Sequence, residues 1–163
     1  MPTIANYRGI IPAISTPFTN DNRIDEPALR KLASWLATHD GIVAVMTNGH
    51  TGEVFALDPE ERAEVTRIVA DELKGKLPVI SSVVCEGLTD AAHHAKLAKQ
   101  AGAVGIDVMP PHHWLRFGFH ADHATTYFQN IYDAVGLDLI CHVYPAWTRA
   151  SYSSALLADL ARL

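Results

Sequence analysis

The sequence predicts an α/β fold built around a parallel sheet, and two observations support this. Short apolar runs rich in valine and isoleucine alternate with longer stretches in which apolar residues recur every three or four positions. Runs that are apolar on both faces are typical of strands buried in a parallel sheet, and the longer period is that of an amphipathic helix. The alternation repeats five times without a linker, so we expect a single domain over residues 1–163.

The five predicted strands share this apolar, β-branched composition. They are Gly9–Ile14, Ile42–Met46, Val79–Val84, Val104–Met109 and Leu137–Tyr144. The periodicity leaves open whether the sheet closes. An open, doubly wound domain would be complete at this length, whereas a (β/α)8 barrel needs about 250 residues, of which five βα units would be the N-terminal portion.

The five predicted helices follow the strands in order. The first begins at Asp25, and the second opens with Asp58 as its cap, Pro59 in the first turn and Glu61 at the capping-box position. The other three are expected near Thr89–Gly102, over Asp122–Ala134 and from Ser153 onward.

Composition and charge argue against several classes of partner. A formal net charge of −5 disfavours nucleic acid and acidic membrane surfaces as partners. The apolar runs are far shorter than the ~20 residues of a membrane span, and residues 1–8 lack the basic start and apolar stretch of a secretory signal. Cys85 and Cys141 show no CxxC spacing, which is typical of reduced thiols, so we expect a cytoplasmic protein.

Distinctive polar and glycine-containing segments follow the predicted strands, where α/β folds place their ligand-binding loops. These segments are Ser15–Phe18 with Asp21–Asp25, Gly49–Glu53 with Leu57–Arg62, Pro110–Trp114, and Val143–Pro145. Taken in this order, they resemble the dihydrodipicolinate synthase / N-acetylneuraminate lyase family of pyruvate-dependent lyases over essentially the whole chain.

The resemblance implies a (β/α)8 barrel, of which this chain holds about five βα units. It implies a lyase or aldolase whose substrate, pyruvate or a related 2-oxo acid, forms a Schiff base with a lysine on the sixth strand. It further implies no separate cofactor and, at full length, a homo-oligomer, either a dimer or a tetramer. A lysine amine attacks only when neutral, and burial at a strand end lowers its pKa toward neutrality.

All five lysines of the sequence fall on predicted helices or on the turn after the second one. They are Lys31, Lys74, Lys76, Lys96 and Lys99. None is expected at a strand end, so the Schiff-base lysine is predicted to be missing from this chain.

The resemblance assigns the substrate carboxylate to the loop that contains Gly49, His50, Thr51 and Gly52. Glycines let the backbone approach a ligand closely, and adjacent N–H groups can bind an anion. The alternative is a tight turn that needs glycine for its dihedral angles alone. Many relatives carry a small hydroxyl or amide residue in place of His50, so histidine there suggests an altered substrate preference or a proton relay.

Three further residues align with, or lie beside, the proton-relay tyrosines of the family. His142 stands where many members carry the first tyrosine, and Tyr144 faces the same side of the strand two residues on. His112 aligns with a second tyrosine, which reaches a neighbouring subunit in tetrameric relatives. The alternatives are a buried core histidine at position 142 and an ordinary exposed loop over His112, His113 and Trp114.

Other functions stay open beside the lyase. One is a catalytically inactive half-barrel that binds small carboxylates or a partner chain. Another is a metal-dependent enzyme that uses His50, His112 and His142, although no HxH or HxxxH pair links them and no metal site is predicted.

Arg149 lies two positions from a substrate-binding arginine of some relatives. The remaining candidates, His93, His94, His120 and His123, are expected on solvated helix faces.

Overall fold

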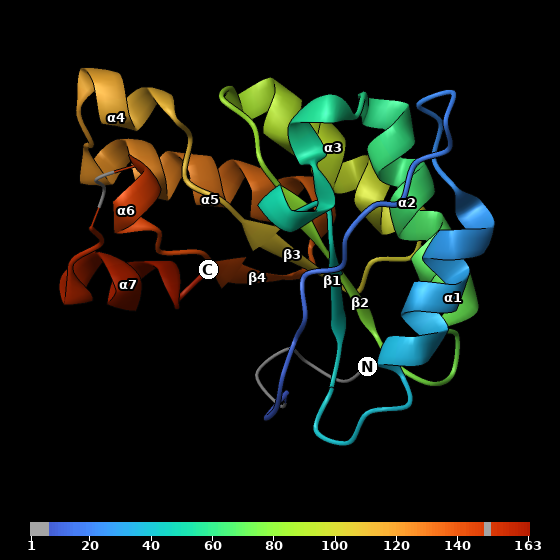
Figure 1. Cartoon of the computed structure of the whole chain (residues 1–163). Coiled ribbons are helices and arrows are strands. Elements are labelled where there is room, and N and C mark those ends of the chain that lie inside the picture. The colour runs from blue at the N-terminus through green and yellow to red at the C-terminus, as the bar shows by residue number, and fades with distance from the viewer. Residues whose placement is uncertain (1–6, 149–150) are drawn as a thin grey trace.

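The computed structural model describes residues 7–148 and 151–163, and in these residues four parallel strands form one sheet (Figure 1). The strands are β1 (Val45–Thr47), β2 (Val79–Val83), β3 (Gly105–Val108) and β4 (Asp138–Cys141). They lie in sequence order, and each pairs in parallel with the next. The four strands after the first are therefore confirmed, with different bounds. β1 starts later than the run Ile42–Met46 and ends one residue beyond it, and β4 ends before His142 and Tyr144, which the prediction placed on the strand.

The prediction of a regular first strand over Gly9–Ile14 is wrong. This segment runs parallel to residues 42–46 but contacts them only through isolated bridges, Ile10 with Ile42 and Ala13 with Met46. The Ile14 amide donates to the Met46 carbonyl at 2.9 Å. Pro12 accepts a hydrogen bond from the Met46 amide but has no N–H to return, which interrupts a regular ladder.

Within the described residues, five longer helices match the five predicted ones: α1 (Glu26–Leu36), α2 (Pro59–Glu72), α3 (Leu88–Gln100), α5 (Ala121–Val135) and α7 (Ser154–Leu160). Asp25 caps α1 and Ser153 caps α7 through their side chains. The predicted capping box of α2 is present, since Asp58 accepts from the Glu61 amide and Glu61 accepts from the Asp58 amide.

In the part of the chain that the structure describes, four short helical segments interrupt the strand-to-helix connections. They are η2 (His50–Gly52), η3 (Val54–Ala56), α4 (His113–Phe117) and α6 (Pro145–Thr148). Local periodicity did not predict them, because a helix of three to five residues is too short to show a repeat. All four follow the carboxyl ends of strands, so they shape that end of the molecule.

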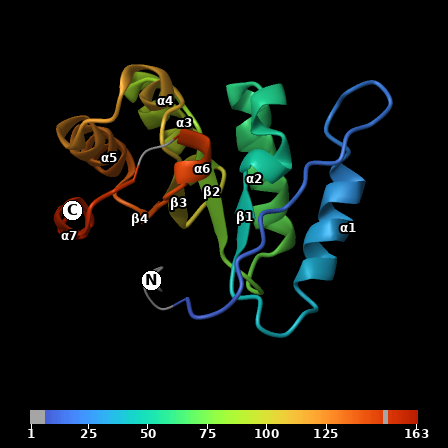
Figure 2. The same ribbon diagram turned by 60° about the vertical axis from the view of Figure 1, so that its left-hand side comes forward.

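The longer helices α1, α2, α3 and α5 follow one another around one face of the sheet (Figure 2). The core is correspondingly divided. A first large cluster fills the space between α1, α2 and β1 around Leu29 and Ile68, and a second fills the space between α3, α5 and β3 around Ile106 and Phe128. A third, small cluster consists of Val54, Val84 and Met109. This packing fixes the strands and therefore the loops at their carboxyl ends.

Candidate active site

Side chains from three predicted loops meet at the carboxyl ends of the strands. The ring centroids of His142 and Tyr144, both just after β4, are 5.8 Å apart. His50, from η2 after β1, has its ring centroid 6.1 Å from that of Tyr144 and 6.2 Å from that of His112, which precedes α4. These four residues lie close together in the structure, and their roles stay predictions.

The loop after β1 is shaped by close packing. A Cβ on Gly52 would lie 3.1 Å from the Ile14 carbonyl oxygen, and Thr16 Oγ1 donates to the Gly52 carbonyl at 2.8 Å. The left-handed positions of the loop are not glycines but Asn48 and Glu53, with φ of 60° and 56°. The interpretation in which glycine serves the dihedral angles of this turn is therefore not supported.

Within the loop, Gly49 and Gly52 are buried, His50 is half-buried and Thr51 is exposed. Among the described residues, the backbone hydrogen bonds that close the loop use the amides of Gly52 and Glu53, which donate to the carbonyls of Gly49 and His50 at 3.0 Å. The Thr51 amide and hydroxyl take part in no hydrogen bond with the part of the chain that the structure describes. These groups are available to a ligand.

A buried network on the helix side of the sheet holds the start of this loop. Asn48 Nδ2 lies 2.9 Å from the Arg62 carbonyl and 3.0 Å from both Thr66 Oγ1 and Ser81 Oγ. Thr47 Oγ1 lies 3.0 Å from Thr66 Oγ1. Four side chains of the network are almost completely buried, namely those of Thr47, Asn48, Thr66 and Ser81. This network ties β1 and β2 to α2 and fixes the backbone immediately before Gly49.

A second group of polar side chains lies on the inner face of the sheet, which is the face opposite to the helices. Asp107, in the middle of β3, is completely buried, and its Oδ2 accepts a hydrogen bond from Ser82 Oγ at 2.8 Å. Its Oδ1 lies 3.3 Å from His142 Nδ1. The hydrogen bond to Asp107 raises the pKa of His142 above its ordinary value, and this outweighs the opposite effect of burial.

His50 has the opposite electrostatic environment. Burial lowers its pKa, and the neighbouring imidazoles of His112 and His142 lower it further. Asp107 acts in the other direction but does not compensate. Two imidazoles of one site therefore have pKa values shifted apart, which is the arrangement that separates a proton donor from a proton acceptor.

The carboxylate of Glu86 holds His112 and His113. The backbone amides of both histidines donate to Glu86 at 2.9 Å, and the Nδ1 atoms of His112 and His113 lie 2.9 and 3.0 Å from the same carboxylate. Burial alone would raise the pKa of Glu86, but these hydrogen bonds lower it. Trp114 is buried in the core, so the segment is not the ordinary exposed loop of the alternative interpretation.

The histidine trio does not form a metal-ligand group. Among the described residues, three candidate ligand atoms come within 4.8 Å of one another only at Cys85, Asp90 and His94. Arg62 Nη1 lies 3.4 Å from His94 Nε2, so a guanidinium already occupies the vicinity where a cation would bind. Burial raises the pKa of Cys85 to about 12, which disfavours the thiolate that a metal requires.

The prediction that His94 lies on a solvated helix face is wrong. His94 is 7% exposed because this face of α3 packs against α2, with Nε2 3.3 Å from Asp90. His93, His120 and His123 are exposed, as predicted. Arg149 lies outside the described residues.

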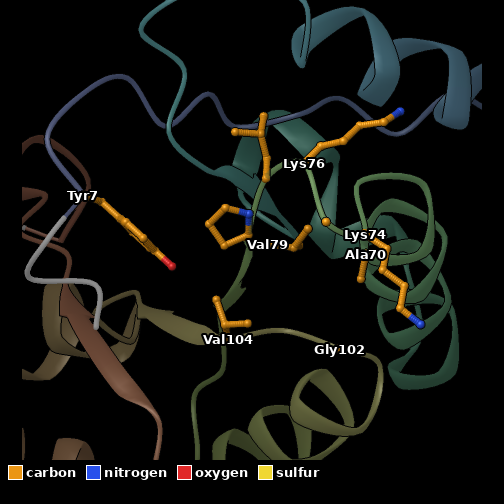
Figure 3. Close-up of a pocket in the computed structure, with 10 residues that line it drawn as sticks. Tyr7, Ala70, Lys74, Lys76, Val79, Gly102 and Val104 are labelled. Atoms are coloured by element: carbon orange, nitrogen blue, oxygen red, sulfur yellow. The ribbon is translucent and has the colours of Figure 1, made fainter. Parts of the chain in front are cut away.

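A hollow of about 390 Å³ lies at the other end of the sheet, near the amino-terminal ends of β2 and β3. Figure 3 shows Tyr7 pointing into it, whereas the amines of Lys74 and Lys76 point outward from its rim. Since α/β folds bind substrates at the carboxyl ends of the strands, this hollow is not the candidate active site.

Sequence reasoning missed three residues of the site, Ser82, Asp107 and Glu86. A signal existed for Asp107, because it is the one ionisable residue within the apolar run Val104–Met109. A carboxylate inside a buried strand is costly unless it is partnered, which makes it a candidate functional residue. No comparable signal marks Ser82 or Glu86.

The parallel sheet and the order of its strands and helices define the chain as part of an α/β barrel. The model of the dihydrodipicolinate synthetase family matches residues 6–163. The chain belongs to this family. The predicted resemblance and fold class are thereby confirmed, and the sheet is part of a (β/α)8 barrel rather than a complete doubly wound domain.

Among curated relatives, the chain is 31% identical to the putative 2-dehydro-3-deoxy-D-gluconate aldolase YagE of Escherichia coli K12, over 99% of this chain and 52% of the relative. It is 33% identical to the N-acetylneuraminate lyase of Escherichia fergusonii, over 86% of this chain and 46% of the relative. The chain spans about half the length of the curated relatives that it matches. The family is therefore one of lyases and aldolases.

Solved structures of similar proteins superpose closely on this chain. The Escherichia coli K12 YagE structure, in complex with pyruvate, superposes with a TM-score of 0.87 at 30% identity, over 96% of this chain and 51% of that one. The dihydrodipicolinate synthase of Agrobacterium tumefaciens gives a TM-score of 0.85 at 25% identity, over 96% of this chain and 52% of that one. In the part of this chain that the structure describes, no helix has the length and apolar character needed to cross a membrane.

Proposed function

We propose that this chain supplies the carboxylate-binding loop and the proton-relay side chains of a Schiff-base lyase or aldolase acting on pyruvate or a related 2-oxo acid. The observation that carries the proposal is the convergence of His50, His112, His142 and Tyr144 beside the loop that contains Thr51. These residues come from three strand ends in a chain of the dihydrodipicolinate synthetase family.

The loop residues would bind the substrate. The Thr51 amide and hydroxyl donate to the carboxylate, and Gly49 and Gly52 keep the backbone close to it. Gly52 has a further reason to be glycine, because a Cβ would press on the Ile14 carbonyl. His50, beside Thr51, contacts the part of the substrate next to the carboxylate.

His142 and Tyr144 would move protons, with His112 next to His50 as a third participant. A histidine whose pKa is near neutrality gives and takes protons at physiological pH. Tyr144 is 37% exposed, so part of this residue is accessible from solvent. In the reaction, a lysine amine adds to the substrate carbonyl and water leaves, and the resulting iminium accepts the electron pair of the carbon–carbon bond that breaks.

We propose that this lysine lies outside the 163 residues. Lys31 is on α1, Lys96 and Lys99 are on α3, and Lys74 and Lys76 follow α2, so none of the five lysines is on a strand. Lys99 Nζ donates to the Val135 carbonyl, which holds it on the helix layer.

The test separates binding from covalent chemistry. Pyruvate is titrated into the ¹⁵N-labelled chain, and shifts are expected at the amides of residues 49–53. Borohydride treatment with pyruvate is expected to leave this chain without an adduct, and to trap one in a polypeptide that also contains the sixth strand. A stoichiometric adduct on one lysine of the 163-residue chain would contradict the lysine assignment, and unchanged loop amides would contradict the loop assignment.

Thr51→Ala provides the matched variant. Losing a hydrogen bond to a charged carboxylate should weaken pyruvate binding by about 1.5–3 kcal/mol, or roughly tenfold to a hundredfold. Thr38→Ala, which removes an exposed hydroxyl that bonds the Trp35 carbonyl, is the control and should bind as the parent does.

The alternative, a catalytically inactive half-barrel that binds small carboxylates or a partner chain, predicts pyruvate binding without an adduct even when the sixth strand is present. The homo-oligomer and the cytoplasmic location stay predictions.

A further inference from the structure

Asp107 is a buried carboxylate that the folding of the sheet alone does not require. It lies in the middle of β3, in register with Ser82 on β2 and with Ile140 on β4. A valine or isoleucine would suit this apolar strand, whereas a carboxylate removed from water is costly unless it is hydrogen-bonded and paired. The groups that contact Asp107 therefore indicate what this carboxylate does.

Both carboxylate oxygens of Asp107 have a polar partner. Ser82 Oγ donates to Oδ2 at 2.8 Å, and His142 Nδ1 lies 3.3 Å from Oδ1. The backbone of His142 is fixed as well, since its amide donates to the Val108 carbonyl at 3.2 Å. The serine thus orients the carboxylate, and the carboxylate and the β3 backbone together orient the imidazole.

We propose that Asp107, oriented by Ser82, is a positioning residue that holds a proton on Nδ1 of His142 and so leaves Nε2 to exchange protons with the substrate. This rests on the proposed function only in that the substrate is a 2-oxo acid at the strand-end site. An imidazole needs a fixed tautomer to act as a base, and a carboxylate at Nδ1 is a common means of fixing it.

The groups facing His142 within the described residues agree with this role. They are Asp107 from β3, His50 from η2 and Tyr144 from its own segment. Asp107 raises the pKa of His142 through its hydrogen bond and charge, whereas burial lowers it. His50, whose pKa is lowered, is the neighbour that stays neutral when His142 is protonated.

The experiment is ¹⁵N NMR of the histidine rings in the whole chain as a function of pH, with the His142 signals assigned by their loss in His142→Gln. In the parent protein, neutral His142 is expected to carry its proton on Nδ1 and to titrate above the ordinary value of 6.5. In Asp107→Asn, the carboxamide can donate to Nδ1. The proton should then move to Nε2 and the titration midpoint should fall.

Two further variants keep the result interpretable. Ser82→Ala should lower the midpoint in the same direction but less, and it supplies the test if Asp107→Asn fails to fold. Asp133→Asn, an exposed carboxylate on α5, is the isosteric control and should change neither tautomer nor midpoint.

A parent His142 with its neutral proton on Nε2 would overturn the proposal. An unchanged tautomer and midpoint in a folded Asp107→Asn, or in Ser82→Ala where Asp107→Asn does not fold, would also overturn it. These measurements need no substrate, so failure of pyruvate to bind would contradict the proposed function while leaving the positioning of His142 intact.

Discussion

Ser81 and Ser82 are adjacent on β2, yet they belong to two different polar clusters on opposite faces of the sheet. Ser81 joins the helix-side network with Thr47, Asn48 and Thr66, in which every side chain is neutral. Ser82 joins the inner cluster, in which its partner Asp107 is ionisable and contacts a titratable imidazole. Alternation of side chains along a strand produces this separation.

The difference distinguishes scaffold from site. The helix-side network is buried, and its groups do not titrate, so it contributes to stability at any pH. The inner cluster ends in His142, whose side chain is 37% exposed and whose charge depends on pH. The two clusters meet at the loop after β1, because Asn48 precedes Gly49, and a Cβ on Gly49 would lie 3.8 Å from Ser82 Oγ.

The largest expected effect is on the helix-side network. Asn48→Ala removes three polar contacts and places alanine at a φ of 60°, so we expect a loss of about 3 kcal/mol in the free energy of unfolding. Chemical denaturation measures it, and the loss should be the same in mildly acid and mildly alkaline buffer. Asn130→Ala, at an exposed position of α5, is the control. A loss that varies with pH would contradict the neutral character of the network.

For Thr66→Val, which keeps the shape of the side chain, we expect a smaller loss in the free energy of unfolding. The hydroxyl of Thr66 contacts Thr47, Asn48 and Ser81, and it donates to the Arg62 carbonyl at 3.1 Å. Removing it leaves buried partners less well satisfied, at a cost of about 1–2 kcal/mol. Thr125→Val is the matched control in the same denaturation experiment, because the hydroxyl of Thr125 donates to the Ala121 carbonyl on an exposed helix face. Equal losses in the two variants would mean that the buried network adds nothing.

Features that depend on residues close together in the sequence could be predicted from it. The capping box at Asp58 and Glu61 is a local pattern, and the structure contains it. The choice of His142 and His112 as candidates followed from the resemblance to the family, and the structure brings both to the candidate site.

The pairings that hold the site could not be predicted locally. Ser82 meets Asp107 because β2 and β3 pair in one register, and a one-residue slip would separate them. The carboxylate of Glu86 meets residues 26 and 27 positions further on, and Pro12 interrupts a strand that composition alone favours. In each case the deciding information is a contact between distant segments, or the absence of one N–H.

The smallest effect is the pH dependence of the inner cluster. The folded-state pKa of His142 is raised, so the stabilisation from its pairing with Asp107 is fully present below the unfolded value of 6.5 and is lost as pH rises through the folded value. The difference in unfolding free energy between the parent and His142→Gln should therefore be larger near about pH 5 than near about pH 9. Because His142 is partly exposed, the change should stay below about 1 kcal/mol. His50 carries the opposite pH dependence, but it is present in both proteins and cancels from the difference to first order. A difference that is constant with pH, or larger in alkaline buffer, would show that the imidazole and the carboxylate are not coupled.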